Sequence, residues 1–134
     1  MDVFGLLDEK LRASLVEKGI IEPTLPQQKL IPLILNGDDV LLLAPTGSGK
    51  TEAAILPVFS KMLSEAGQPI STIYITPLRA LNRDMLARLI EYGKAVGLSV
   101  LIKHSDISDK ERREIVIHPP NVLITTPESL QIML

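Results

Sequence analysis

The 134 residues are enough for one domain with its own core, because single domains run from roughly 50 to 250 residues. Hydrophobic residues make up 46% of the chain and charged residues 22%, which excludes an intrinsically disordered chain. The net charge of −2 gives no overall attraction for nucleic acid, and the absence of cysteine excludes disulfides and thiolate metal sites. No signal peptide and no apolar stretch of about 18 residues is visible, so we expect a cytoplasmic protein without membrane contact.

Two helices are predicted in the first part of the chain. The first helix has apolar residues at helical spacing and ends at Gly19. Its apolar positions are Phe4, Leu7, Leu11 and Leu15. The second helix is expected over residues 27–35 and is closed by Asn36 and Gly37. Both helices are expected to pack by their apolar faces.

The remainder of the chain alternates between predicted strands and helices. The first strand, Val40 to Ala44, is apolar throughout, which is typical of a strand buried on both faces. Further strands are expected over residues 72–76, 99–103 and 121–125, and helices over residues 51–66, 78–96 and 109–117. Pro57 should kink the first of these helices. This alternation predicts an α/β fold with a parallel sheet and helices on both faces.

A glycine-rich segment, PTGSGKT at residues 45–51, joins the first expected strand to the helix after it. Gly47 and Gly49 permit tight backbone geometry, so that successive N–H groups can point at phosphate oxygens. Lys50 would neutralise the β and γ phosphates and the Thr51 hydroxyl would bind Mg²⁺, which makes both candidate catalytic residues. The predicted nucleotide-binding residues in this loop are Thr46, Gly47, Ser48, Gly49, Lys50 and Thr51.

A glutamine upstream of the loop is a candidate for recognising the base. The Gln27 carboxamide presents one donor and one acceptor, which match the N6 amino group and N7 of adenine. Gln28 offers the same groups, so the residues alone leave both open.

The segment from Gly19 to Gln27 has the pattern G-x-x-x-P-T-x-x-Q, and APTGSGKT follows at residues 44–51. Together they resemble the Q motif and motif I of superfamily 2 helicases, although Ile20 replaces the usual aromatic residue. The resemblance implies a RecA-like P-loop NTPase domain with ATP and Mg²⁺ as cofactors. It also favours Gln27 as the residue that reads adenine.

Two later strings resemble motifs of the large helicase-related (Lhr) family. YITPLRALNRDM, residues 74–85, is similar to motif Ia, and TTPESL, residues 125–130, to motif Ib. The resemblance implies that both segments contact nucleic acid, through Pro77, Arg79, Arg83, Thr126, Pro127 and Glu128. Arg79 and Arg83 are four residues apart, so we expect them on one face of a helix. Thr126 and Glu128 also fit the start of the next helix.

His104-Ser105-Asp106 occupies the place where Lhr-like proteins have H-G-D. Ser105 replaces the glycine of that motif. The three side chains are adjacent in the chain and diverge, so they do not form a hydrolase triad.

In helicases of this class, a further strand ending in Asp-Glu and a second RecA-like domain are needed for ATP hydrolysis. Neither is expected within residues 1–134, so we interpret the chain as the N-terminal portion of the first RecA-like domain, ending before the Walker B motif. It should bind ATP but be inactive alone. In the full protein, ATP hydrolysis would move single-stranded or duplex DNA, RNA or an RNA-DNA hybrid. The alternatives are a DEAD-box RNA helicase fragment and a non-catalytic nucleotide- or nucleic-acid-binding module.

Overall fold

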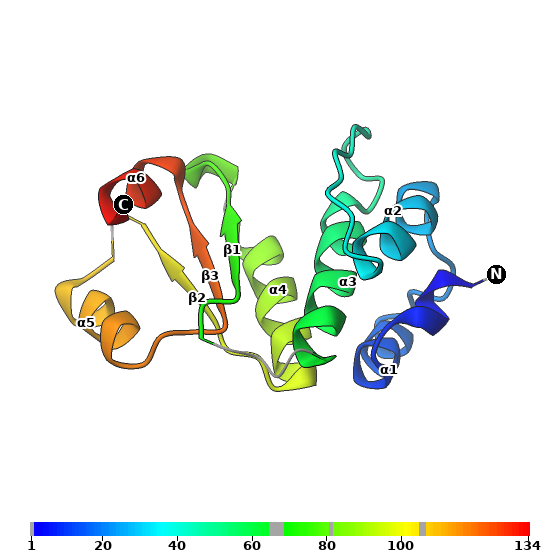
Figure 1. Ribbon diagram of the computed structural model, residues 1–134, viewed down its shortest axis with the longest axis horizontal. Coiled ribbons are helices and arrows are strands. Elements are labelled where there is room, and N and C mark those ends of the chain that lie inside the picture. Colours follow the sequence, from blue (N-terminus) through cyan, green and yellow to red (C-terminus); the bar gives the residue numbers. More distant parts are fainter. Residues whose placement is uncertain (1, 65–68, 81, 105–106) are drawn as a thin grey trace. The chain divides into compact units, whose positions relative to one another are not determined.

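The computed structural model describes residues 2–64, 69–80, 82–104 and 107–134 (Figure 1). The chain divides into two compact units, Met1–Ala66 and Gly67–Leu134. The helices within the described ranges are all too short or too polar to cross a membrane.

The first unit is helical in its described part. Its elements are the 3-10 helix η1 (Val3–Leu6) and the helices α1 (Glu9–Glu17), α2 (Leu25–Leu35) and α3 (Lys50–Ser64). α2 packs along α3, and the core contains apolar side chains that are at most 5% exposed. These include Phe4, Leu11, Leu15, Leu30, Ile31, Leu56 and Phe59. α3 is a single helix that contains Pro57, and the kink expected at this proline stays a prediction.

The single helix expected from Phe4 to Gly19 is wrong, because η1 and α1 are separate elements. Asp8 lies between them as the N-cap of α1, and its side chain accepts a hydrogen bond from the Lys10 N–H at 2.9 Å. Its own N–H donates to Ser60 Oγ of α3 at 2.9 Å. A capping aspartate therefore starts a new helix where the apolar spacing alone indicated continuity.

The strand expected at Val40–Ala44 is also wrong in this structure. The segment has no strand assignment, and Leu41 and Leu43 are each 86% exposed. The two strand pairings found in the described residues join β1, β2 and β3 alone, which lie in the second unit. Apolar composition identified a segment suited to a buried strand, but a strand also needs a hydrogen-bonded neighbour.

The second unit contains a parallel three-stranded sheet with the order β1-β3-β2. The strands are β1 (Thr72–Ile75), β2 (Val100–Lys103) and β3 (Val122–Thr125), and the helices are η2 (Leu78–Ala80), α4 (Arg83–Val96), α5 (Asp109–Ile117) and α6 (Pro127–Met133). The register places Ile73 and Leu101 on either side of Leu123. The three strands expected from the later part of the sequence are therefore confirmed.

Helices cover both faces of this sheet, as predicted. On one face, Gly93 of α4 approaches the chain so closely that an added Cβ would lie 2.7 Å from Val100 Cγ2. On the other face, Ile115 of α5 packs with Ile107 and Leu123. Val100 and Leu123 belong to opposite faces because residues alternate along paired strands. Figure 1 shows α4 on one side of the sheet and α5 on the other.

Candidate nucleotide and nucleic-acid sites

The loop before α3 has the backbone geometry that phosphate binding requires. Gly47 and Gly49 have φ angles of 82° and 77°, in the left-handed region that favours glycine. Ser48 Oγ donates a hydrogen bond to the Pro45 carbonyl oxygen at 2.6 Å, which tightens the turn. α3 begins at Lys50, so the loop lies at the positive end of a 15-residue helix.

The polar side chains of the loop are placed for contact with a ligand from solvent. Thr46 and Lys50 are exposed, and Thr51 is half-buried in the first turn of α3. An exposed ammonium group beside a helix N-terminus attracts an anion, and a hydroxyl group is a suitable ligand for a hard cation. The described residues contain no cluster of three or more His, Asp or Glu side chains that could hold a metal by themselves.

Gln27 is connected to the same loop. Its side chain is 4% exposed, and its Nε2 donates a hydrogen bond to the Gly49 carbonyl oxygen at 3.2 Å. Its Oε1 accepts the Thr24 N–H at 3.0 Å. Each end of the carboxamide can make one further hydrogen bond, because the NH₂ group carries two hydrogens and the oxygen two lone pairs. A Cβ at Gly49 would collide with Gln27, so the loop and this glutamine fit each other closely.

The other glutamine, Gln28, has a different environment. It is exposed, and its Nε2 donates to the Pro23 carbonyl oxygen at 3.2 Å. Only Gln27 of the pair has a hydrogen bond to the glycine loop among the described contacts.

Sequence reasoning missed Thr24. Its Oγ1 accepts the Gln27 N–H at 3.4 Å, and the Gln27 side chain accepts the Thr24 N–H in return. This is a capping box, and the pattern T-x-x-Q carried its signal. Thr24 therefore fixes the side chain of Gln27 as well as the start of α2.

In the second unit, the two segments that resemble helicase motifs leave the same edge of the sheet. Ile75 pairs with Thr125, and the Thr76 N–H donates to the Thr125 carbonyl oxygen at 3.0 Å. Pro77 and Pro127 follow these strand ends and are exposed. The carboxyl edge of a parallel sheet is where open α/β folds bind ligands.

Arg79 and Arg83 do not lie on one face of one helix, so that prediction is wrong. Arg79 is part of η2, and Arg83 is the first residue of α4. Asn82 separates them as the N-cap of α4, with its Oδ1 accepting the Met85 N–H at 2.8 Å. Both arginine side chains are exposed. They remain on neighbouring segments after β1 without the fixed spacing of a helix.

Thr126 and Glu128 differ in their surroundings. Thr126 is 3% exposed, and its Oγ1 accepts the Ser129 N–H at 3.2 Å as the N-cap of α6. The expected capping role of Thr126 is confirmed. Glu128 is exposed, as is Pro127 before it. Thr126 therefore shapes the segment, while Pro127 and Glu128 present its surface.

The His104-Ser105-Asp106 trio is only partly described. His104 is half-buried after β2, and Ser105 and Asp106 lie outside the described residues.

Comparison with known proteins links these features to one family. Residues 24–134 match the family model for DEAD/DEAH box helicases. The ATP-dependent helicase Lhr-Core of Sulfolobus acidocaldarius is 43% identical over 124 residues, covering 83% of this chain and 14% of the relative. The ATP-dependent RNA helicase DBP9 of Coccidioides immitis is 32% identical over 128 residues, covering 90% of this chain and 21% of the relative.

Solved structures are similar over almost the whole chain. The Mycobacterium smegmatis helicase Lhr bound to ssDNA and AMP-PNP has a TM-score of 0.83 and 31% identity, over 99% of this chain and 18% of that one. A hypothetical ATP-dependent RNA helicase from Sulfolobus tokodaii has a TM-score of 0.79 and 28% identity, over 95% of this chain and 36% of that one. The chain thus spans a small part of the length of these proteins.

Proposed function

Because the chain belongs to the DEAD/DEAH box helicase family, we propose that it binds ATP as part of an Lhr-like, ATP-dependent helicase or translocase. The observation that carries this proposal is the loop before α3, where two left-handed glycines precede a helix N-terminus. Such a loop directs backbone N–H groups toward phosphate oxygens without a clash from a Cβ.

The loop residues have separate roles in the proposed site. The backbone of residues 46–51 would hold the phosphates, and the exposed Lys50 ammonium would neutralise the β and γ groups. The Thr51 hydroxyl would bind Mg²⁺, which takes few protein ligands when phosphates and water supply the others. The ion would offset the negative charge of the phosphates, while the chain positions them.

Adenine recognition is assigned to Gln27. One N–H and one lone pair of its carboxamide stay available after its bonds to Gly49 and Thr24. Those groups complement N7 and the N6 amino group of adenine, and they mismatch guanine. Because the same side chain holds the Gly49 carbonyl oxygen, base recognition and loop geometry depend on one residue.

The carboxyl edge of the sheet is the proposed contact for a nucleic-acid strand. Pro77, Arg79 and Arg83 leave β1 at this edge, and Thr126, Pro127 and Glu128 leave β3 beside them. The exposed guanidinium groups would bind phosphates, which fixes position on the strand without reading sequence. DNA is favoured by the likeness to the Lhr structure bound to ssDNA, and RNA or an RNA-DNA hybrid is the alternative substrate.

We further propose that residues 1–134 are the N-terminal portion of the first RecA-like domain, before the Walker B motif. Hydrolysis in this class needs carboxylates that hold Mg²⁺ and orient water, and an arginine finger. The paired acids Asp8-Glu9 and Asp38-Asp39 do not follow a strand in the described structure. Residues 1–134 would then bind ATP without turning it over. A cytoplasmic location stays a prediction.

A DEAD-box RNA helicase is the second candidate, supported by relatives such as DBP9. The Lhr-like assignment is preferred because the identity to Lhr-Core is higher and because TPLRALNRDM and TTPESL match its motifs. A non-catalytic nucleotide- or nucleic-acid-binding module is the third.

Paired titrations with labelled ATP and labelled single-stranded DNA test the two surfaces separately. Lys50→Ala should weaken ATP binding by roughly 10- to 100-fold, because it removes a contact to a charged group, and leave DNA binding intact. Arg79→Ala should do the opposite. An equal loss of both ligands in both variants would contradict the assignment. ATPase activity of wild type that Lys50→Ala abolishes would contradict the claim that residues 1–134 bind without hydrolysis.

A further inference from the structure

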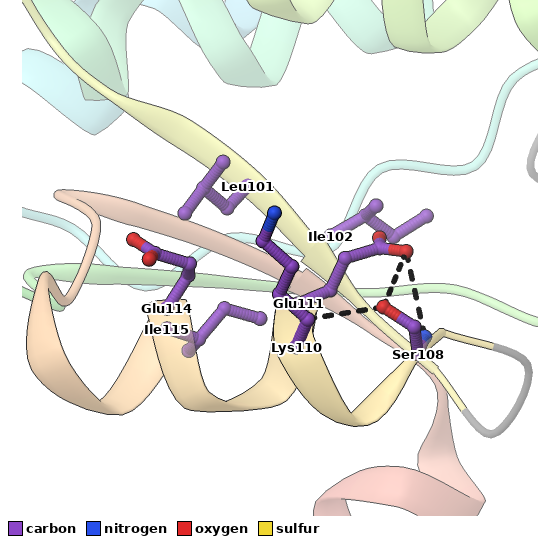
Figure 2. Close-up of a pocket in the computed structure, with 7 residues that line it drawn as sticks. All are labelled: Leu101, Ile102, Ser108, Lys110, Glu111, Glu114 and Ile115. Atoms are coloured by element: carbon purple, nitrogen blue, oxygen red, sulfur yellow. Dashed lines mark hydrogen bonds between the residues drawn. The ribbon is translucent and has the colours of Figure 1, made fainter.

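A groove of about 410 Å³ lies between β2 and α5 in the second unit, and none of the site residues assigned above lines it (Figure 2). Leu101 and Ile102 line it from the strand, and Ile115 lines it from the helix. Lys110, Glu111 and Glu114 form its polar rim. Figure 2 shows the strand side chains on one side of the groove and the helix side chains on the other.

The apolar wall of this groove is incompletely covered. Leu101 pairs in register with Leu123, so both side chains lie on the α5 face of the sheet. Leu123 is 3% exposed because Ile107 and Ile115 pack over it, whereas Leu101 is 40% exposed. Burying the remainder of a leucine side chain would contribute favourably to the binding of an apolar group.

The groove also runs along the edge of β2 that has no paired strand within the described ranges. β2 pairs with β3 on one side, and within the described ranges no strand pairs with its other side. The Val122 N–H donates to the Ser99 carbonyl oxygen, so the main-chain groups of Ser99 face β3. Because these groups alternate in direction along a strand, the N–H and C=O groups of Leu101 and Lys103 also face β3. The N–H and C=O groups of Ile102 then point outward. They offer main-chain hydrogen bonds to an extended segment that lies along β2.

The charge of the rim determines which charged side chains a bound segment can have. Glu111 and Glu114 contribute two carboxylates against the single ammonium of Lys110, so the groove is acidic on balance. The Glu111 carboxylate is held at 3.1 Å from Ser108 Oγ by the capping box of α5, as the dashed lines in Figure 2 show. Glu114 is exposed on the same rim, and its carboxylate makes no such local hydrogen bond within the described part of the chain. A basic residue of the occupant fits beside it.

We propose that β2 and α5 bind an extended peptide segment of a partner protein, in which apolar residues alternate and a basic residue flanks them. The segment adds to the edge of β2 through main-chain hydrogen bonds, places an apolar side chain against Leu101 and Ile115, and sets its cation beside Glu114. Main-chain bonds give affinity and the groove gives selectivity.

A second copy of this chain fits the groove less well. One apolar segment that the chain could offer, Val40–Ala44, has exposed Leu41 and Leu43 and directly follows Asp38 and Asp39. Those carboxylates would be brought toward an already acidic rim, and like charges repel. A partner segment with lysine or arginine at that position has the complementary charge.

Fluorescence anisotropy with a labelled peptide, Lys-Val-Thr-Val-Thr-Val-Lys, tests the proposal on the 134-residue chain. Leu101→Lys should weaken binding by about tenfold through loss of the apolar contact, and Glu114→Lys by about two- to fivefold through loss of a surface ion pair. Val116→Lys is the matched control, because Val116 is on the same helix, is 76% exposed and does not line the groove.

Two further peptides distinguish strand addition from non-specific binding. A proline at the central valine removes a main-chain donor and should abolish binding, and glutamate in place of both lysines should weaken it. Amide signals of β2 and α5 should shift in heteronuclear NMR spectra, which also confirm that each variant is folded.

Absence of saturable binding, equal binding of the proline peptide, or an equal effect of Val116→Lys would overturn the proposal. So would a dimer in light scattering that Leu101→Lys dissociates and the peptide does not displace, because the occupant would then be a second copy.

Discussion

Two short apolar segments, Val40–Ala44 and Val122–Thr125, have similar sequences and opposite environments. Every residue of β3 is buried, because β1 and β2 flank it and helices cover both faces. Val40–Ala44 has no strand assignment, and Leu41 and Leu43 are almost fully exposed. Apolar composition therefore makes a segment able to become a buried strand, while the neighbouring strands and helices decide whether it does.

In the described residues of the first unit, helices pack against one another without a sheet. α2 and α3 pack against each other, and the Thr24–Gln27 capping box connects α2 to the glycine loop. The glycine loop proposed to bind nucleotide therefore derives its shape from local helix contacts in this unit. The segments proposed to contact nucleic acid derive theirs from the ends of paired strands.

The largest effect is expected at the centre of the sheet. Ile124→Ala should lower the free energy of unfolding by about 2–5 kcal/mol, because Ile124 is 1% exposed and truncation leaves a cavity. Urea denaturation measures this. Ile124→Val, which removes one methylene, should cost about 0.5–1.5 kcal/mol. Equal stability of Ile124→Ala and wild type would show that β3 is not the core of the second unit.

The contact of α4 with β2 should be the next most sensitive. Gly93→Ala places a Cβ 2.9 Å from the Leu98 carbonyl oxygen, so the helix must shift and about 1–3 kcal/mol is lost. Gly5→Ala is the control, because nothing lies within 4 Å of its added Cβ. Thermal unfolding of the two variants compares them. A Gly93→Ala midpoint as high as that of Gly5→Ala would refute the close approach.

The cap of α2 tests how far the first unit depends on local helix contacts. Thr24→Ala should destabilise the protein by about 1 kcal/mol, since it removes the acceptor for the Gln27 N–H. Thr24→Ser keeps the hydroxyl group and should restore most of the loss. Hydrogen exchange of the α2 amides measures the effect locally. Equally faster exchange in Thr24→Ala and Thr24→Ser would show that loss of the capping hydroxyl is not what destabilises α2.

The smallest change in stability is expected in the unpaired apolar segment. Leu43→Lys should alter the free energy of unfolding by less than about 0.5 kcal/mol, because the side chain is 86% exposed. It should also reduce self-association in analytical ultracentrifugation, since exposed apolar segments promote it. A decrease of about 2 kcal/mol or more in the free energy of unfolding, which is typical of changes at buried leucines, would mean that Leu43 is buried in solution.

Sequence patterns identified most of the second unit. The expected helix over residues 109–117 agrees with α5, and the three strands agree within a residue at each end. These elements were predicted correctly because each strand and the helix after it lie close together in the sequence and pack against each other. The strand predicted at Val40–Ala44 was wrong because the sequence of a segment does not show whether a neighbouring strand is present to pair with it.

Within the candidate site, the backbone of the glycine loop followed from the sequence, whereas the arrangement of the two arginines did not. Gly47 and Gly49 have the backbone that their loop pattern predicts. The shared helix face of Arg79 and Arg83 was wrong because Asn82 is a strong N-cap, a signal that spacing arguments overlook. The bond between Gln27 and Gly49 could not be foreseen, since it joins segments 22 residues apart.

Calorimetric titration of Mg·ATP into wild type and Gly49→Ala shows whether the geometry of the glycine loop is what binds ATP. The added Cβ would strain a residue with φ of 77° and collide with Gln27, without changing any charge. We predict saturable binding to wild type and a loss of at least about tenfold in Gly49→Ala, with Gly5→Ala unchanged. Equal affinity of wild type and Gly49→Ala, or no binding to wild type, would show that the geometry of this loop does not bind ATP.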